Sequence, residues 1–300
     1  MENVNRGDSN QITREYFDQL LLEMRQIDAV LPSTKLSLYG ETFDSPVMTA
    51  ALSHLNNTCK HGMEEMAKGA KMSGCVHWCG MGEDEELEEI CKTGARTIKI
   101  IKPHKDNQVI FHKIKQAERC GAFAVGMDID HAFNMQGGYD VVCGLEMRPK
   151  SLEELKEFIA STKLPFIIKG VLSERDAEKC LEAGAKGIVV SHHHGIMSSC
   201  VPPLMILPSI ANVIDGRIPI FVDCGVENGM DVFKALALGA TAVSIGRATM
   251  EPLKQGGATA VQNYLNKTTA ELSSIMARTG FHNLEEIDDS VLWNRNGGRR

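Results

Sequence analysis

Eight short apolar segments alternate with longer amphipathic segments along this chain, and this alternation restricts its fold more than any other feature. A strand, a helix and a second strand in series form the unit of a parallel sheet. Eight such units predict an α/β protein of the closed (β/α)8 type, a TIM barrel, rather than an open sheet. The predicted strands are Val47–Ala51, Gly74–Trp78, Thr97–Ile101, Ala122–Met127, Phe166–Lys169, Gly187–Val190, Ile218–Val222 and Ala242–Ile245.

The segments between these strands have apolar residues at helical spacing. The predicted helices are Glu83–Lys92, Asn107–Cys120, Ser151–Ser161, Glu174–Ala183, Val232–Leu238 and Ala258–Arg278.

Two segments lie outside the repeat of strands and helices. Residues 11–43 contain a predicted helix, Thr13–Ile27, which we expect to cover the barrel floor or to carry a residue at its entrance. Residues 128–163 form a long connection of the kind that often serves as a lid. We expect a single domain over residues 1–300 with an N-terminal helical extension of residues 1–43.

The net charge and the cysteine content indicate which class of partner the protein binds and in which cellular compartment it lies. A net charge of −7 argues against nucleic acid and anionic membranes as partners. The sequence has no run of about 18 apolar residues that would predict a membrane span. The nine cysteines show no CxxC spacing, which fits free thiols in a reducing cytoplasm. We therefore expect a cytoplasmic protein that acts on a small molecule.

Two predicted strands end in residues suited to an anion. Gly225 follows the seventh strand and Gly246 follows the eighth, and a glycine there lets backbone N–H groups approach a phosphate. Arg247 adds a planar cation that matches phosphate oxygens, and Asp223 can accept hydrogen bonds from hydroxyl groups. Many barrels bind phosphate after strands seven and eight. The alternative is that these are turn glycines and a surface arginine.

Lys169 ends an apolar predicted strand, where an ammonium group is costly unless it meets a partner. At the mouth of a barrel it would face a ligand, and the alternative is a rim lysine with its ammonium group in water.

Two stretches of the sequence resemble the FMN-dependent α-hydroxy-acid oxidases and dehydrogenases, the relatives of glycolate and lactate oxidase. They are PFIIKGVLSERDAEKCLEAGAKGIVVSHHHG (165–195) and RIPIFVDCGVENGMDVFKALALGATAVSIGR (217–247). The resemblance covers most of residues 40–285 and is most specific in the C-terminal half.

The resemblance implies FMN as the cofactor and a set of residues around it. The positions that match flavin-ring contacts are Ala51, Leu52, Ser53, Lys99, Lys169 and Ser191; those that match ribityl and phosphate contacts are Asp223, Gly225, Gly246 and Arg247. Among these, Lys169 matches the lysine that stabilises negative charge on the reduced ring.

Three consecutive histidines follow the sixth predicted strand, where the family has Ser-Asn-His-Gly and uses the histidine as a base. An ungapped alignment from Ser191 onward places His193 at that position, whereas alignment on the His-Gly pair selects His194. Histidine can exchange a proton near neutral pH, which suits it to this role. Adjacent residues point in different directions, so we expect no metal site here. Polar loop residues without a special role are the remaining alternative.

The chain departs from the family pattern where the family binds its substrate carboxylate. Ile196 stands at the position of one family arginine, and residues 128–147 contain no counterpart of a second. Glu227 replaces an arginine that helps to bind the flavin phosphate, while Lys99 and Ile101 replace a glutamine and a tyrosine. Because charge-assisted bonds to a carboxylate are lost, we expect a substrate other than glycolate or lactate. Candidates for lining an altered pocket are His54, His77, Cys79, Asp128, Asp130 and His131.

Taken with the resemblance, the sequence predicts an FMN-dependent oxidoreductase in which a histidine base acts as a hydride equivalent moves to flavin N5. One alternative is an FMN-dependent isomerase of the type 2 isopentenyl diphosphate isomerase kind, and another is a non-catalytic flavin-binding barrel. By analogy with the family we also expect a homo-oligomer, in particular a tetramer.

Overall fold

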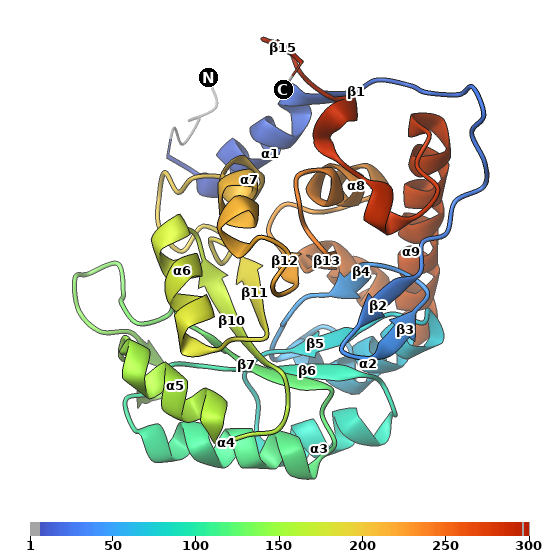
Figure 1. Cartoon of the computed structure of the whole chain (residues 1–300). Coiled ribbons are helices and arrows are strands. Elements are labelled where there is room, and N and C mark those ends of the chain that lie inside the picture. Colours follow the sequence, from blue (N-terminus) through green and yellow to red (C-terminus); the bar gives the residue numbers. More distant parts are fainter. Residues whose placement is uncertain (1–6, 296, 300) are drawn as a thin grey trace, which may run out of the picture.

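The computed structural model describes residues 7–295 and 297–299 and is built on one eight-stranded parallel sheet (Figure 1). Its strands neighbour one another in the order β4-β13-β12-β11-β10-β7-β6-β5. Between β4 and β5, the amide of Thr49 donates to the carbonyl of Val76 at 3.3 Å, and a parallel bridge joins Leu52 to Cys79. These contacts close the sheet, which confirms the (β/α)8 prediction. The strands are β4 Val47–Thr49, β5 His77–Cys79, β6 Thr97–Ile101, β7 Ala124–Asp128, β10 Phe166–Val171, β11 Gly187–Val190, β12 Ile220–Val222 and β13 Ala242–Ile245.

Side chains along each strand alternate between the barrel interior and the surrounding helices, as the pleat of a strand requires. Ile98 and Ile100 of β6 belong to an inner cluster with Trp78 and Phe221, whereas Ile101 belongs to the outer cluster beneath the helices. The rings of Trp78 and Phe221 meet edge to face with their centroids 5.1 Å apart. The interior is therefore a packed core, and a ligand can bind only at an end of the barrel.

Helices cover the outside of the barrel (Figure 1). They are α2 Gly62–Met72, α3 Asp84–Lys92, α4 Asn107–Arg119, α5 Leu152–Ala160, α6 Glu174–Ala183, α7 Pro203–Ile214, α8 Gly229–Ala237 and α9 Met250–Thr279. Apolar spacing alone did not identify α2 or α7, and α9 extends beyond its predicted start across a kink at Gly256 and Gly257. Within the described residues, no helix combines the length and the apolar character needed to cross a membrane.

The predicted helix Thr13–Ile27 is wrong in its bounds, because the chain turns into a strand eight residues earlier. Helix α1 is Ser9–Gln19, and β1, Leu20–Leu22, then pairs antiparallel with β14, Leu292–Asn294, which pairs with β15, Gly298–Arg299. Strand β14 lies at the opposite end of the sequence, so helical spacing near the N-terminus gives no sign of this pairing. The first six residues of the predicted extension lie outside the described residues.

Helix α1 lies over the carboxyl ends of the barrel strands, at the entrance, and does not cover the floor. Its Thr13 hydroxyl is 2.7 Å from Nε2 of His192, which follows β11, and its Arg14 donates to the carbonyl of Gly225, which follows β12, at 3.2 Å. The floor is covered instead by a hairpin of β2, Leu36–Leu38, and β3, Glu41–Phe43. There the ring of Phe43 packs 5.4 Å from that of Phe123 at the start of β7.

Shorter elements complete the chain. The connection after β7 contains a small hairpin of β8 and β9, so the predicted lid segment has regular structure there as well as in α5. The bounds are β8 Val141–Val142, β9 Leu145–Glu146, and the 3-10 turns η1 Leu55–Asn57, η2 Arg247–Thr249, η3 Leu284–Glu286 and η4 Asp289–Val291.

Candidate functional site

A pocket of about 310 Å³ opens at the carboxyl ends of the barrel strands, where the loops after β4, β11, β12 and β13 meet. It brings together eight of the eleven residues predicted to bind the cofactor or to take part in catalysis: Ala51, Leu52, Lys169, His193, Asp223, Gly225, Gly246 and Arg247. Ser191 is buried just beneath it and accepts a hydrogen bond from the amide of His193 at 3.0 Å. Ser53 and Lys99 are not among the residues that line it.

One end of the pocket presents hydrogen-bond donors that lack acceptors. Within residues 7–295, the amides of Gly225 and Gly246 donate to no other group, and the exposed guanidinium of Arg247 forms neither a hydrogen bond nor an ion pair. Gly225 has a left-handed φ of 77°, and a Cβ there would lie 3.0 Å from the Thr13 side chain, so glycine is required. Unpaired amides and a free guanidinium at the ends of adjacent strands fit a phosphate group. Glu227 also lines the pocket and opposes an anion on that side.

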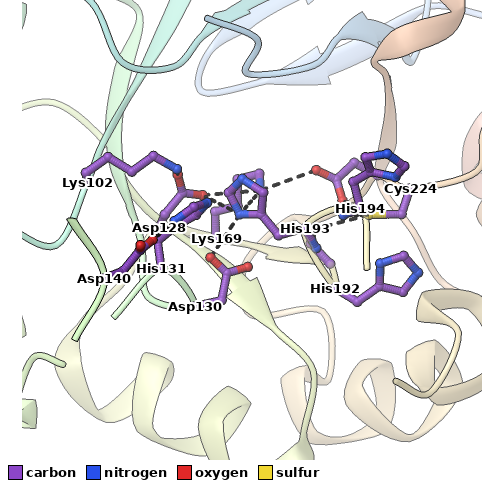
Figure 2. Close-up of polar contacts among 12 residues, drawn as sticks. Lys102, Asp128, Asp130, His131, Asp140, Lys169, His192, His193, His194 and Cys224 are labelled. Atoms are coloured by element: carbon purple, nitrogen blue, oxygen red, sulfur yellow. Dashed lines mark hydrogen bonds and ion pairs between the residues drawn. The ribbon is translucent and has the colours of Figure 1, made fainter. Parts of the chain in front are cut away.

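At the other end, a buried lysine joins two buried carboxylates. The ammonium of Lys169 lies 3.2 Å from Oδ1 of Asp128 (Figure 2) and 3.5 Å from Oδ2 of Asp223. Burial opposes charge on all three groups, but their mutual attraction prevails: the pKa of Lys169 lies well above its ordinary value, and those of Asp128 and Asp223 lie below theirs. Lys102 donates to the other oxygen of Asp128 at 2.8 Å. This cluster therefore keeps its charges at neutral pH.

His193 belongs to the same cluster. Its Nδ1 lies 2.9 Å from Oδ1 of Asp130 and 3.6 Å from Oδ1 of Asp128, so a carboxylate can accept its Nδ1–H and leave Nε2 free for a ligand. The residue holds a left-handed φ of 47°, a conformation that is uncommon for non-glycine residues. The His131 ring meets it edge to face at 4.4 Å, and His131 is itself held by Asp140 at 2.9 Å. The His193 ring is thus held from two sides (Figure 2).

The structure distinguishes the three consecutive histidines. Only His193 contacts the carboxylates of the Lys169 cluster. His194 is exposed and turns its Nδ1 to Asn10 of α1, although it also lines the pocket. His192 is buried against Thr13, and this burial lowers its pKa. These placements favour His193 as the residue that can act on a bound molecule.

Lys99, expected beside the flavin ring, lies on the outer face of β6 and not at the mouth. The inner positions of this strand are Ile98 and Ile100, so the alternation carries Lys99 toward the helices, where its ammonium donates to the carbonyl of Gly80. The next inward-facing lysine is Lys102, which reaches Asp128. Lys102, which directly follows β6, is therefore the lysine that this part of the barrel contributes to the contacts around His193.

Several other residues were only weakly indicated by the sequence. Asp128 and Asp130 stood out only as polar residues at the end of a strand, and nothing in the sequence indicated their contact with His193. By contrast, His77 is buried against Thr49 at 2.8 Å, and burial lowers its pKa to about 3. None of the six residues expected to line an altered pocket lines this one: Asp128, Asp130 and His131 contact His193 behind it, and His54, His77 and Cys79 lie elsewhere.

The carboxylates around His193 also have the composition of a metal site. Potential ligand atoms of Asp128, Asp130 and His193 lie within 4.8 Å of one another. The ammonium groups of Lys169 and Lys102, however, already contact both oxygens of Asp128. Positive charge at this position is thus supplied by lysine.

Gly170 permits the contact between Asp130 and His193, and an alanine there tests it. Its φ is +92°, and an added Cβ would lie 2.5 Å from the Asp130 carboxyl carbon. Gly216 is the control: its φ is +67° and nothing lies within 4 Å of such a Cβ. Gly216→Ala should therefore lower the free energy of unfolding only by the backbone cost, about 1–2 kcal/mol. We expect Gly170→Ala to lower the free energy of unfolding in urea by more than this and to shift the NMR signals of the His193 ring. Equal losses of free energy in the two variants, with an unchanged His193 signal, would show that the Asp130 side chain moves aside without cost.

The chain is similar to a set of flavin enzymes. The family model described as FMN-dependent dehydrogenase matches residues 2–152 and 146–294. A 2-hydroxyacid oxidase of Dictyostelium discoideum is 28% identical, over 97% of this chain and 84% of that protein. A glycolate oxidase of Spinacia oleracea is 29% identical, over 93% and 86%. Among solved structures, a mandelate oxidase mutant with a monooxide FMN adduct superimposes with a TM-score of 0.85 at 27% identity, over 93% of this chain and 89% of that one.

Proposed function

Because the chain belongs to the FMN-dependent dehydrogenase family and is an FMN-dependent oxidoreductase, we propose that it oxidises the carbinol carbon of a small 2-hydroxy compound in the pocket above β10 to β13. The observation that carries this proposal is that His193 and Lys169 lie in one pocket with the unpaired backbone amides of the two glycines and the unpaired guanidinium of Arg247.

We propose that the donor-rich end of the pocket holds the cofactor's phosphate, through the amides of Gly225 and Gly246 and the side chain of Arg247. Asp223 would accept hydrogen bonds from the ribityl chain. Ala51, Leu52, Ser53, Lys169 and Ser191 would then surround the ring. When bound, FMN supplies the acceptor for the two electrons that leave the substrate.

In this proposal His193 takes the substrate proton at Nε2. The contact of Nδ1 with Asp130 at 2.9 Å supports it, because a carboxylate there orients the ring and stabilises the imidazolium that forms. Lys169 keeps a positive charge next to the ring position, held by Asp128 and Asp223. Asp130 would act as a positioning residue, since it reaches the substrate only through His193.

We further propose that the substrate is not a simple glycolate or lactate. Ile196 stands at the position of the family's carboxylate-binding arginine, and no replacement guanidinium lies among the residues that hold His193. A substrate carboxylate would therefore leave water without gaining a charge-assisted bidentate contact. A neutral 2-hydroxy ester or amide avoids this cost.

Anaerobic mixing of the FMN-saturated protein with matched pairs of substrates tests the proposal. Oxidation of a substrate must bleach the visible flavin absorption, whereas an isomerase would turn over without net bleaching. We expect the methyl ester and the amide of lactate to bleach the flavin faster than lactate itself. Faster bleaching by the free acids would contradict the substrate assignment, and no bleaching by any 2-hydroxy compound would contradict the proposed reaction. The cytoplasmic location and the tetramer stay predictions.

A further inference from the structure

A second cavity, of about 140 Å³, lies between the end of β6, helix α4 and the β8–β9 hairpin. It shares no lining residue with the pocket above β10 to β13. Liquid water takes about 30 Å³ per molecule, so the cavity has room for roughly four or five heavy atoms. Among its lining residues are Lys99, Lys102, His104 and Lys113, and the one carboxylate, Glu83, is exposed. The wall is therefore strongly cationic for its size.

Lys99 is the group in this wall that most needs a ligand. It is 4% exposed, and its ammonium donates to the backbone carbonyl of Gly80, with no carboxylate at ion-pair distance among the described residues. The other two lysines are neutralised: Lys102 by Asp128 at 2.8 Å and Lys113 by Asp84 at 2.6 Å. Glu86 acts on Lys99 only from beyond ion-pair distance. A buried cation that contacts no carboxylate is costly, and an anion in the adjoining cavity would reduce that cost.

His104 provides a second, independent indication. Its side chain is 5% exposed and lines the cavity, and its buried Nδ1 has no hydrogen-bond partner. Buried polar atoms are nearly always paired, so an unpaired one on a cavity wall indicates a missing partner. Burial and the surrounding lysines lower the pKa of His104 to about 4, so the ring is neutral near pH 7 and can donate one N–H.

We propose that this cavity binds a compact oxyanion, of the size of phosphate or a short carboxylate, through Lys99 and His104. The site is separate from the FMN phosphate, which belongs to the other pocket. Lys102 links the two, because it lines the cavity while donating to Asp128, which lies 3.6 Å from His193. Figure 2 shows Lys102 and His193 together around Asp128. A bound anion would share the Lys102 ammonium with Asp128 and so alter the charge beside His193.

Calorimetric titration of the FMN-saturated protein tests the site, since saturation keeps phosphate from the Arg247 loop. Sodium phosphate and sodium acetate are titrated separately at an ionic strength held constant with chloride, and the stronger binder identifies the anion. We expect saturable binding by at least one of them, weakened about tenfold or more by Lys99→Met, because a hydrogen bond to a charged group is lost. Lys105→Gln, at an exposed lysine that pairs with Glu146 and does not line the cavity, should leave binding unchanged.

Thermal unfolding shows whether a variant binds the anion weakly because it has lost the binding group or because it is misfolded. In anion-free buffer Lys99→Met should unfold at the same temperature as the native protein or higher, since it removes a buried cation that contacts no carboxylate among the described residues. The anion should raise the unfolding temperature of the native protein and of Lys105→Gln but not of Lys99→Met. His104→Phe, which keeps Lys99, should also weaken binding. Absence of saturable binding by both anions, or equal binding by native protein and Lys99→Met, would overturn the proposal.

Discussion

Replacement of His193 by alanine should slow flavin reduction by the substrate by about 10²- to 10⁴-fold, the range for loss of a positioned base. His193 is the histidine that lines the pocket and also contacts the carboxylates of the Lys169 cluster, so its removal leaves no group in that position to take the proton. The Arg247 loop is untouched, and FMN should stay bound. The rate is measured by anaerobic stopped-flow bleaching at saturating substrate, and bound FMN by visible absorption.

His194→Ala is the matched control for this change. His194 is the next residue, also has a positive φ and also lines the pocket, but its Nδ1 faces Asn10. We expect it to keep most of the rate. If His194→Ala instead lost the rate while His193→Ala kept it, the alternative alignment on the His-Gly pair would be right and His194 would be the base.

Lys169→Met should lower the free energy of unfolding by about 3–5 kcal/mol at neutral pH, as expected when one partner of a buried ionic cluster is removed. The side chains of Lys169 and Asp128 are 6% and 4% exposed, so little solvent screens the charges left behind. Asp128 keeps Lys102, but Asp223 has no other ion-pair partner among the described residues. Urea unfolding with and without excess FMN separates this loss from weaker cofactor binding.

The double variant Lys169→Met with Asp223→Asn controls for lost packing. Removal of the uncompensated carboxylate should recover part of the free energy, because the two effects are coupled through one contact. If the double variant were as unstable as the sum of the two single changes, the charge of Lys169 would contribute little and its aliphatic chain would account for the loss.

The same variant should depend on pH in a defined direction. In the native protein Lys169 holds the pKa values of Asp128 and Asp223 below their ordinary values, so their ionic contribution to stability is present above the unfolded pKa of about 4 and is lost as pH falls through the folded pKa values. Without Lys169, burial dominates at Asp223 and raises its pKa, so the variant loses stability as pH rises. The difference between native protein and Lys169→Met should therefore shrink as the pH is lowered from neutral toward mildly acidic.

Much of the site could be predicted from sequence because barrel geometry converts position along a strand into position in space. Any residue just after a parallel strand of a closed barrel lies at the same rim. The locations of Lys169, His193, Gly225 and Arg247 therefore followed from recognising where four apolar segments end. Their chemical types then indicated phosphate binding, and the resemblance to the α-hydroxy-acid oxidases implied proton transfer by His193.

What the tertiary structure alone decided is which side chains meet at that rim. The contact of Asp130 with His193 joins residues 63 apart and needs the gap that Gly170 leaves at its positive φ. Helix α1 reached the entrance because β1 pairs with β14 near the other end of the chain. Lys99 fell outside the pocket because a strand alternates its faces residue by residue and position 99 is on the outer face, whereas Lys102, three residues further along, reaches Asp128. Local patterns determined the strands and the rim, whereas partners distant in sequence depend on packing that no local pattern encodes.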